Sequence, residues 1–148
     1  MGKVFEQVCK FKNKYPGTIT WFRLHKHAKV VEDHLNEGEE PIYSFAGQKN
    51  DDVLDIWSTC VVCLTNKRII IAQDHILVGY TMSTITPDMF NDLQVYSGII
   101  FGKITIDTLK ETVVITNLDK KCLPEVETQI TTFMMEEKKK YGSNKDKK

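Results

Sequence analysis

The sequence predicts an α+β fold in which two helices precede seven short antiparallel strands and one amphipathic helix closes the chain. Apolar residues recur at helical spacing before residue 36, at strand spacing or in short apolar runs from residue 41 to residue 116, and again at helical spacing after Pro124. Most spacers between the candidate strands have hairpin length, which favours antiparallel neighbours. With 148 residues, the chain has room for one proper core.

Two helices are predicted at the N-terminus. The first covers residues 3–14 and ends near Tyr15, because Pro16 and Gly17 follow it. The second covers residues 19–36, and Gly38 suits a left-handed position after its end. Its apolar residues form a narrow seam that must be buried against some neighbour. The seam consists of Trp21, Leu24, Ala28, Val31 and Leu35.

Seven strands follow, joined by short turns. They are predicted at residues 41–48, 55–64, 68–73, 76–82, 93–98, 99–107 and 111–116. The second strand is apolar on both parities, so both of its faces should be covered. In the sixth strand, Ile100, Ile104 and Ile106 point to the same face of the sheet, so the opposite face of this strand is predicted to be exposed to solvent. Pro87 and Asp88 indicate a single helical turn between the fourth and fifth strands.

The last helix begins at Pro124, which is well tolerated in a first helical turn. Its apolar stripe contains Val126, Ile130, Phe133 and Met134. A lysine-rich tail at 141–148 is predicted to be disordered.

Bulk composition predicts an intracellular, cytoplasmic protein. The formal net charge at pH 7 is zero, so no global field attracts the chain to nucleic acid or to anionic lipid. Charged residues interrupt the first 14 positions, which is unlike a secretory signal peptide. No apolar run reaches the 18 residues that predict a membrane-spanning helix.

Neither a metal site nor a catalytic site is predicted. Cys60 and Cys63 form a C-x-x-C within a predicted strand, where residues three apart point to opposite faces, so they are expected to be buried apolar residues. His25, His27 and His34 lack the spacing of a metal motif. No nucleophile elbow, P-loop or dinucleotide-binding turn is present. We therefore expect a protein that is no enzyme, with no cofactor and no specific nucleic-acid partner.

Several motifs resemble bacterial pleckstrin-homology (PH)-like domains of the YokE type. They are "HLNEGEEPIY", "VVCLTNKRIIIAQ", "VGYTMSTITPDMFNDLQVYSGIIFGKITIDT" and "VVITNLDKKCLPEVETQI". The resemblance covers roughly residues 40–138. It implies a PH-like seven-stranded antiparallel β-barrel or sandwich capped by the C-terminal helix and preceded by the N-terminal helical hairpin. The implied organisation is helices in 1–39, a PH-like domain in 40–140 and the tail in 141–148.

The resemblance also implies where a lipid headgroup would bind. PH domains that bind phosphoinositides gather basic residues in the first hairpin loop, but here Lys49 is accompanied by Asp51, Asp52 and Asp55. Those carboxylates would repel an inositol polyphosphate. The adjacent Lys67 and Arg68 diverge, which favours a turn at 65–67 over a phosphate clamp.

Two functions follow as hypotheses. The first is a non-catalytic PH-like binding or assembly module, whose partner is another protein or a second copy, with the seam of the second helix as the candidate assembly surface. The alternative is a peripheral module that binds an anionic membrane surface. Its candidate contacts are Arg23, Lys26, Lys29, Lys49, Lys67 and Arg68.

Overall fold

The computed structural model describes residues 2–17, 21–49 and 55–146. Its helices are α1 (Lys3–Lys14), α2 (Leu24–Asp33) and α3 (Leu123–Asp146). Its strands are β1 (Pro41–Gln48), β2 (Thr59–Thr65), β3 (Ile69–His75), β4 (Gly79–Ile85), β5 (Phe90–Ser97), β6 (Phe101–Thr108) and β7 (Thr112–Asp119). Single 3-10 turns are η1 (Ile56–Ser58), η2 (Pro87–Met89) and η3 (Lys120–Cys122).

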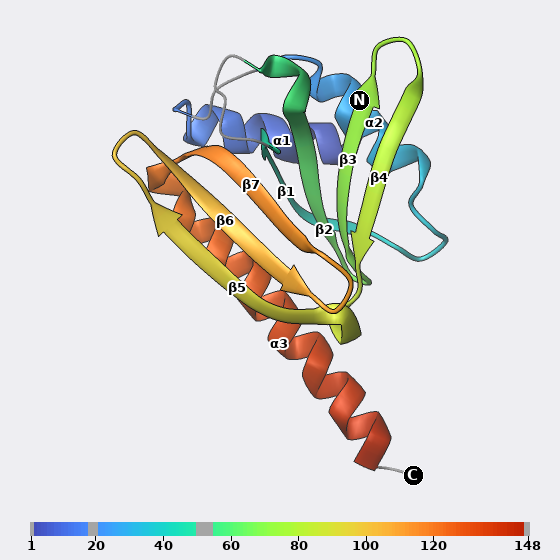
Figure 1. Ribbon diagram of the computed structural model, residues 1–148. Coiled ribbons are helices and arrows are strands. Elements are labelled where there is room, and N and C mark those ends of the chain that lie inside the picture. The colour runs from blue at the N-terminus through green and yellow to red at the C-terminus, as the bar shows by residue number, and fades with distance from the viewer. Residues whose placement is uncertain (1, 18–20, 50–54, 147–148) are drawn as a thin grey trace.

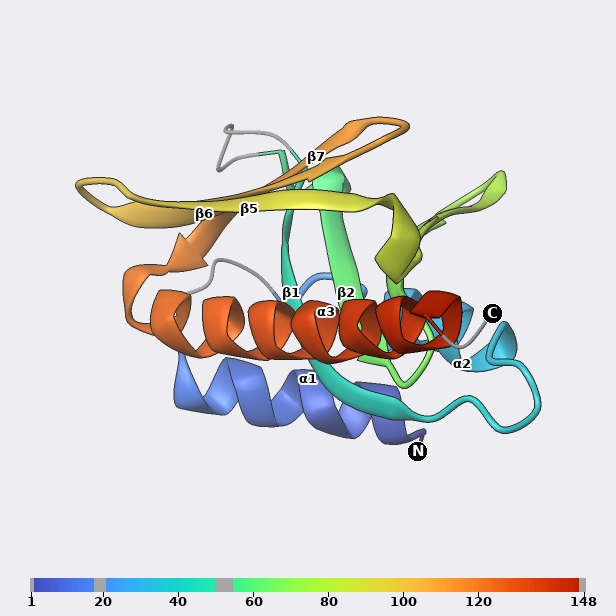
Figure 2. The ribbon, with the colours of Figure 1, turned by 90° about the horizontal axis from the view of Figure 1, so that it is seen from below.

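The seven strands form one antiparallel sheet in the order β4-β3-β2-β1-β7-β6-β5. The sheet is folded at its middle, because β1 and β7 pair only at Gln48 and Thr116. Figure 1 shows the resulting half-barrel, with β1–β4 as one wall and β5–β7 as the other. Figure 2 shows α3 lying along the inner side of the second wall, with α1 beside it. The predicted PH-like architecture is confirmed.

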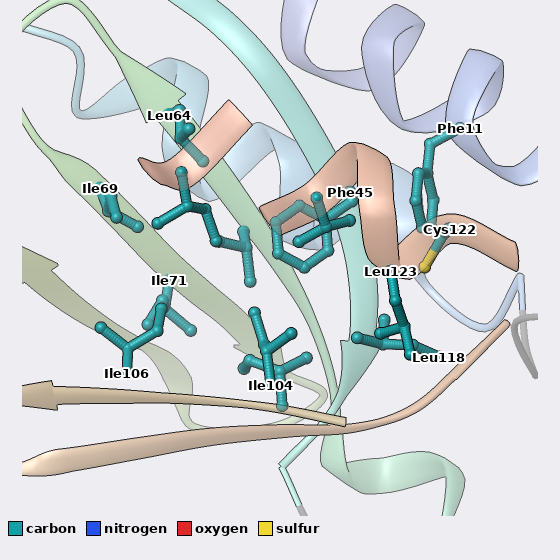
Figure 3. Close-up of a cluster of buried hydrophobic side chains, with 14 of the residues drawn as sticks. Phe11, Phe45, Leu64, Ile69, Ile71, Ile104, Ile106, Leu118, Cys122 and Leu123 are labelled. Carbon is teal, nitrogen blue, oxygen red and sulfur yellow. The ribbon is translucent and has the colours of Figure 1, made fainter. Parts of the chain in front are cut away.

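The main core fills the space between the two walls and α3. It contains Phe45 from β1, Val62 and Leu64 from β2, and Ile104 and Ile106 from β6, all with essentially no exposed surface. Figure 3 shows these side chains meeting those of α3 and of Phe11 from α1. Burial of so many large aliphatic side chains is the main driving force for closing α3 onto the sheet.

A second core lies on the outer face of β1–β4, beneath α1 and α2. Val4 and Val8 of α1 and Leu24, Ala28 and Val31 of α2 pack there. They contact strand residues whose side chains point away from the main core. These residues are Ala46, Val61, Cys63, Ile70 and Ala72. The prediction that both faces of the second strand are covered is therefore confirmed.

Cys60 and Cys63 lie in different cores, as their spacing on one strand predicts. Burial raises the pKa of Cys60 to about 12 and that of Cys63 to about 11, so both remain protonated thiols at neutral pH. Both are free and act as small apolar residues in the interior.

Several element boundaries differ from the sequence predictions. Strand β2, predicted from residue 55, begins at Thr59 after the 3-10 turn η1. Helix α2 begins at Leu24, because Arg23 adopts a left-handed conformation with φ 55°, and residues 18–20 lie outside the described part. Residues 76–78 form a turn, which closes at Gly79 with φ 90°, so β4 begins three residues later than predicted. Residues 99–100 likewise form a turn before β6. In both hairpins, apolar residues that were predicted to belong to a strand form the turn at the tip.

The predicted disordered tail is also shorter than expected. Helix α3 runs to Asp146, six residues past the predicted boundary at 140. No proline follows Pro124, and the Glu- and Lys-rich composition of 136–140 has good helix propensity, so nothing in the sequence stops the helix there.

His27 lies in α2 above the end of β3 and is buried. Its Nδ1 accepts a hydrogen bond from the backbone N–H of Asp74 at 2.7 Å, which places the ring proton on Nε2. Within the described residues, Nε2 has no hydrogen-bond partner. The pKa of His27 is lowered to about 4, mainly by burial; Asp74 opposes this shift, and Arg23, His75 and Lys49 contribute to it.

We predict that stability falls as the pH drops from 6.5 towards 4. The unfolded chain protonates His27 near its ordinary pKa of 6.5, whereas the folded chain does so only near pH 4. The free energy of unfolding should therefore decrease by about 1.4 kcal/mol per pH unit across that window. Urea unfolding at several pH values measures this slope.

The variant His27→Gln should flatten the slope, and the matched variant His25→Gln, at an exposed position of the same helix, should leave it in place. An unchanged slope in His27→Gln would show that another group carries the dependence.

Candidate functional site

The "TNKR" motif joins the β2–β3 turn to the segment that precedes β1. Thr65 Oγ1 accepts hydrogen bonds from the backbone N–H groups of Lys67 and Arg68, both at 3.0 Å, and so shapes the turn. Asn66 Oδ1 accepts from the backbone N–H of Glu40 at 2.9 Å, and Asn66 Nδ2 donates to the carbonyl of Gly38 at 3.0 Å. The motif therefore holds the chain where it passes from α2 into the sheet.

Arg68 belongs to the same hydrogen-bond network. Its Nε donates to Glu39 Oε2 at 2.9 Å, and its Nη2 donates to Glu39 Oε1 and to the carbonyl of His34, both at 3.0 Å. Thr65 Oγ1 also donates to Glu39 Oε2 at 2.7 Å. Burial raises the pKa of Glu39, but the hydrogen bonds from Arg68 and Thr65 outweigh it and hold the pKa below its ordinary value.

The six predicted anion contacts do not converge on one place. Arg23 pairs with Asp74 near the end of β3, while Arg68 precedes the first residue of that strand. Lys29 pairs with Asp33 one helical turn away. Of the others, Lys26 and Lys67 are exposed and Lys49 is half-buried after β1.

The predicted assembly seam faces the inside of the chain. Leu24, Ala28 and Val31 are buried against β2 and β3, and Leu35 packs at the margin of the same cluster. Trp21 precedes α2 and is 53% exposed, with the ammonium of Lys12 5.5 Å from its ring centre. Of the two arrangements that the sequence allows, packing on the chain's own sheet is the one found for Leu24, Ala28 and Val31, while Trp21 stays exposed.

Two hollows were considered as ligand sites. One, of about 280 Å³, lies at the open side of the half-barrel and is lined by Lys49, Ser83 and Glu111 among others. The other, of about 340 Å³, lies between α1, β1 and α3. In the second, Glu125 already pairs with Lys14 and accepts a hydrogen bond from Tyr43 Oη at 2.8 Å.

The described residues contain neither a cluster of metal ligands nor a helix that could cross a membrane. No three His, Cys, Asp or Glu side chains gather as they must to hold a metal ion. No helix combines the length and the apolar content needed to cross a membrane.

The outer edge of β4 is a surface that the sequence reading missed. β4 is the last strand of the sheet, and all seven of its residues pair with β3 without a register shift. The preceding turn consists of Ile76, Leu77 and Val78, whose exposed fractions are 44%, 91% and 83%. Figure 1 shows this hairpin projecting beyond the rest of the molecule.

The tip of the β5–β6 hairpin is a second exposed apolar surface, formed by Ile99 and Ile100. One signal pointed to both tips. In each case a run of strand-forming residues lies beside a single glycine, which readily adopts the backbone conformations of a tight turn. Gly79 and Gly98 mark these two places.

We predict that Arg68 stabilises the fold through Glu39. The substitution Arg68→Met leaves a carboxylate with a fully buried side chain without its cation, which should lower the free energy of unfolding by about 3 kcal/mol. The neighbouring exposed variant Lys67→Met should change it by less than about 0.5 kcal/mol. Urea unfolding of the two variants decides, and equal effects would contradict the role assigned to Arg68.

Comparison with known proteins gives the family. Residues 35–132 match the family described as Bacterial PH domain. The crystal structure of a pleckstrin homology domain from Shewanella amazonensis SB2B superposes with a TM-score of 0.52 at 15% identity, covering 74% of this chain and 96% of that one. This likeness supports the fold.

A DUF1696 family protein with a pleckstrin-homology domain from Shewanella loihica PV-4 gives a TM-score of 0.47 at 11% identity, covering 76% of this chain and 91% of that one. That score is too low to support an argument. No curated protein matches the chain. Because the family match covers more than half of the residues and agrees with the half-barrel and its closing helix, the chain belongs to the bacterial PH domain family.

Proposed function

We propose that this protein is a non-catalytic assembly module that pairs with a second copy of itself through the outer edge of β4. The PH-like fold supports a binding module in general. The observation that carries the proposal is the open, uncharged edge of a fully paired strand. An unpaired strand edge presents a row of backbone donors and acceptors, which is a template for adding another strand.

The two end strands of the sheet differ in how they are protected. β5 has a register shift between Phe90 and Asp92, carries the charge of Asp92 and packs against α3. Bulges, charges and covering elements are the usual means by which proteins prevent edge-to-edge pairing. β4 has no register shift, and residues 79–85 include neither a charged residue nor a proline; the end of α2 contacts the strand through His34 and Tyr80.

The apolar turn continues this surface beyond the end of the strand. Residues 75–85 contain no Lys, Arg, Asp or Glu, so two such hairpins meet without repulsion between like charges. Tyr80 is 52% exposed beside the turn, and its hydroxyl bonds His34 Nε2 at 2.8 Å. A second copy would remove the apolar turn and Tyr80 from water, which favours association.

The other predicted function, membrane binding through the basic residues of α2, has less support than assembly through β4. Asp74 neutralises Arg23, Asp33 neutralises Lys29, and Arg68 is held by Glu39. Among the described residues, Lys26 and Lys67 are the members of this basic set that are exposed and form no ion pair, and they lie in different segments, namely α2 and the β2–β3 turn. A surface with so little net positive charge attracts anionic lipid weakly.

We predict that the purified chain forms oligomers and that a charge on the β4 edge dissociates them. Thr81 is exposed on β4, so Thr81→Lys should place two like charges close together when edges pair. Light scattering during size-exclusion chromatography should give a multiple of the monomer mass for the wild type and the monomer mass for Thr81→Lys.

The matched control is Thr105→Lys on β6, a strand that is paired on both sides. This control should keep the wild-type mass. A monomeric wild type over the accessible concentration range, or equal masses for the two variants, would rule out assembly through β4.

A further inference from the structure

We propose that the hollow between α1, β1 and α3 is a docking groove for an extended acidic segment of a partner protein. The segment pairs with the free edge of β1, places one large apolar side chain against Ile42 and brings carboxylates to Lys10. The groove is separate from the β4 edge, because β1 lies in the middle of the sheet order and β4 at its end. The partner bound there is a different protein, held in addition to a second copy.

The hollow lies at an edge of β1 that no strand covers. Helix α1 packs on the outer face of β1, where Val8 and Ala46 belong to one cluster, whereas the inner face contributes Phe45 to the main core beside α3. A space lined by both helices must therefore lie along the edge of β1. Within the described residues, β1 pairs with β2 from Pro41 onward but with β7 only at Gln48. The first half of β1 thus has one edge open to an added strand.

A β-bulge turns Ile42 into the hollow. The register of β1 against β2 shifts between Pro41 and Tyr43, so Ile42 is the extra residue. Its side chain is 52% exposed, and it lines the hollow together with Phe11 and Tyr43. Bulges re-aim a side chain, often beside a binding site. Ile42 is therefore an apolar contact that the fold itself leaves uncovered.

The charges around the hollow favour an acidic ligand. Its lining residues include two lysines and one glutamate. Glu125 is already matched by Lys14, whereas Lys10 is exposed and forms no ion pair within the described chain. Glu6, one helical turn before Lys10, is the only acid in α1, which carries four lysines. The net charge at the hollow is positive, so it attracts carboxylates that flank an apolar anchor.

The dimensions of the hollow suit an extended segment. The two helices meet where Lys14 pairs with Glu125, and Figure 1 shows them diverging from that end. The volume of about 340 Å³ is near the lower end of the range for ligand pockets, roughly 300–1,000 Å³. That space holds one large side chain and its neighbours but no whole helix. An extended segment needs no more, because its backbone bonds to the strand edge and only alternate side chains point inward.

The test starts from random short peptides that are displayed on phage and selected on the full-length chain. The selected peptides should combine one large apolar residue with neighbouring Asp or Glu residues. Fluorescence anisotropy then measures the dissociation constant of a selected peptide for variants of the chain. Ile42→Thr removes the apolar contact and keeps a β-branched residue in the strand, and Lys10→Glu reverses the charge. Each should weaken binding about tenfold.

Matched variants separate this groove from other surfaces. Ile100→Thr at the exposed β5–β6 tip and Lys26→Glu on α2 make the same chemical changes elsewhere, and both should bind the peptide like the wild type. Thr81→Lys should also bind it normally, so a failure of assembly through β4 does not affect this test. Ile42 and Lys10 belong to neither core, so urea unfolding should show unchanged stability for their variants.

The groove would be overturned by a selection that enriches no sequence of this acidic and apolar kind, or by peptide binding that survives both Ile42→Thr and Lys10→Glu. A change of the oligomer mass in Ile42→Thr would also contradict it, since the occupant of the groove would then be a second copy.

Discussion

A strand that is apolar on both faces must be covered twice, and β2 imposes that requirement on the whole chain. Cys60, Val62 and Leu64 face the space between the two walls, while Val61 and Cys63 face the opposite side. One cover is α3 with the second wall of the sheet, and the other is the helical pair α1 and α2. The N-terminal helices therefore complete the core of this barrel, and their apolar seams are used within the chain.

This double covering leaves few places for a partner. The two sheet faces of β1–β4 and the inner face of β5–β7 are occupied, and the charges of α2 are largely neutralised by Asp33 and Asp74. Two hairpin tips, residues 76–78 and 99–100, are among the exposed apolar surfaces near the sheet. One tip adjoins an open strand edge and lacks charge, while the other is backed by lysines.

The sequence predicts the element order well, because burial on one or both faces leaves a periodic record. Helix α1 and strand β1 have the predicted bounds, and the double burial of β2 could be read from its apolar parities. The residues of the two hairpin tips were wrongly predicted as strand, because their apolar pattern resembles that of a buried strand. Ile76, Leu77, Val78, Ile99 and Ile100 have strong strand propensity, and only the backbone of a neighbouring glycine reveals that they turn.

The role of Arg68 shows another limit of sequence reading. Its neighbours predict the turn correctly, but the partner that occupies its guanidinium is Glu39, 29 positions earlier in the chain. A contact of that sequence separation depends on how α2 enters the sheet, which no local pattern records. The start of α2 was missed for a related reason, since the left-handed Arg23 is held by Asp74 on a distant strand.

The most direct test of the central claim is amide hydrogen exchange of β4 measured at increasing protein concentration. If a second copy pairs with this edge, the amides of Gly79–Ile85 that point away from β3 gain protection as the concentration rises, while those at the outer edge of β5 do not change. Exchange of the β4 amides at the same rate from the most dilute to the most concentrated sample would contradict assembly through this edge.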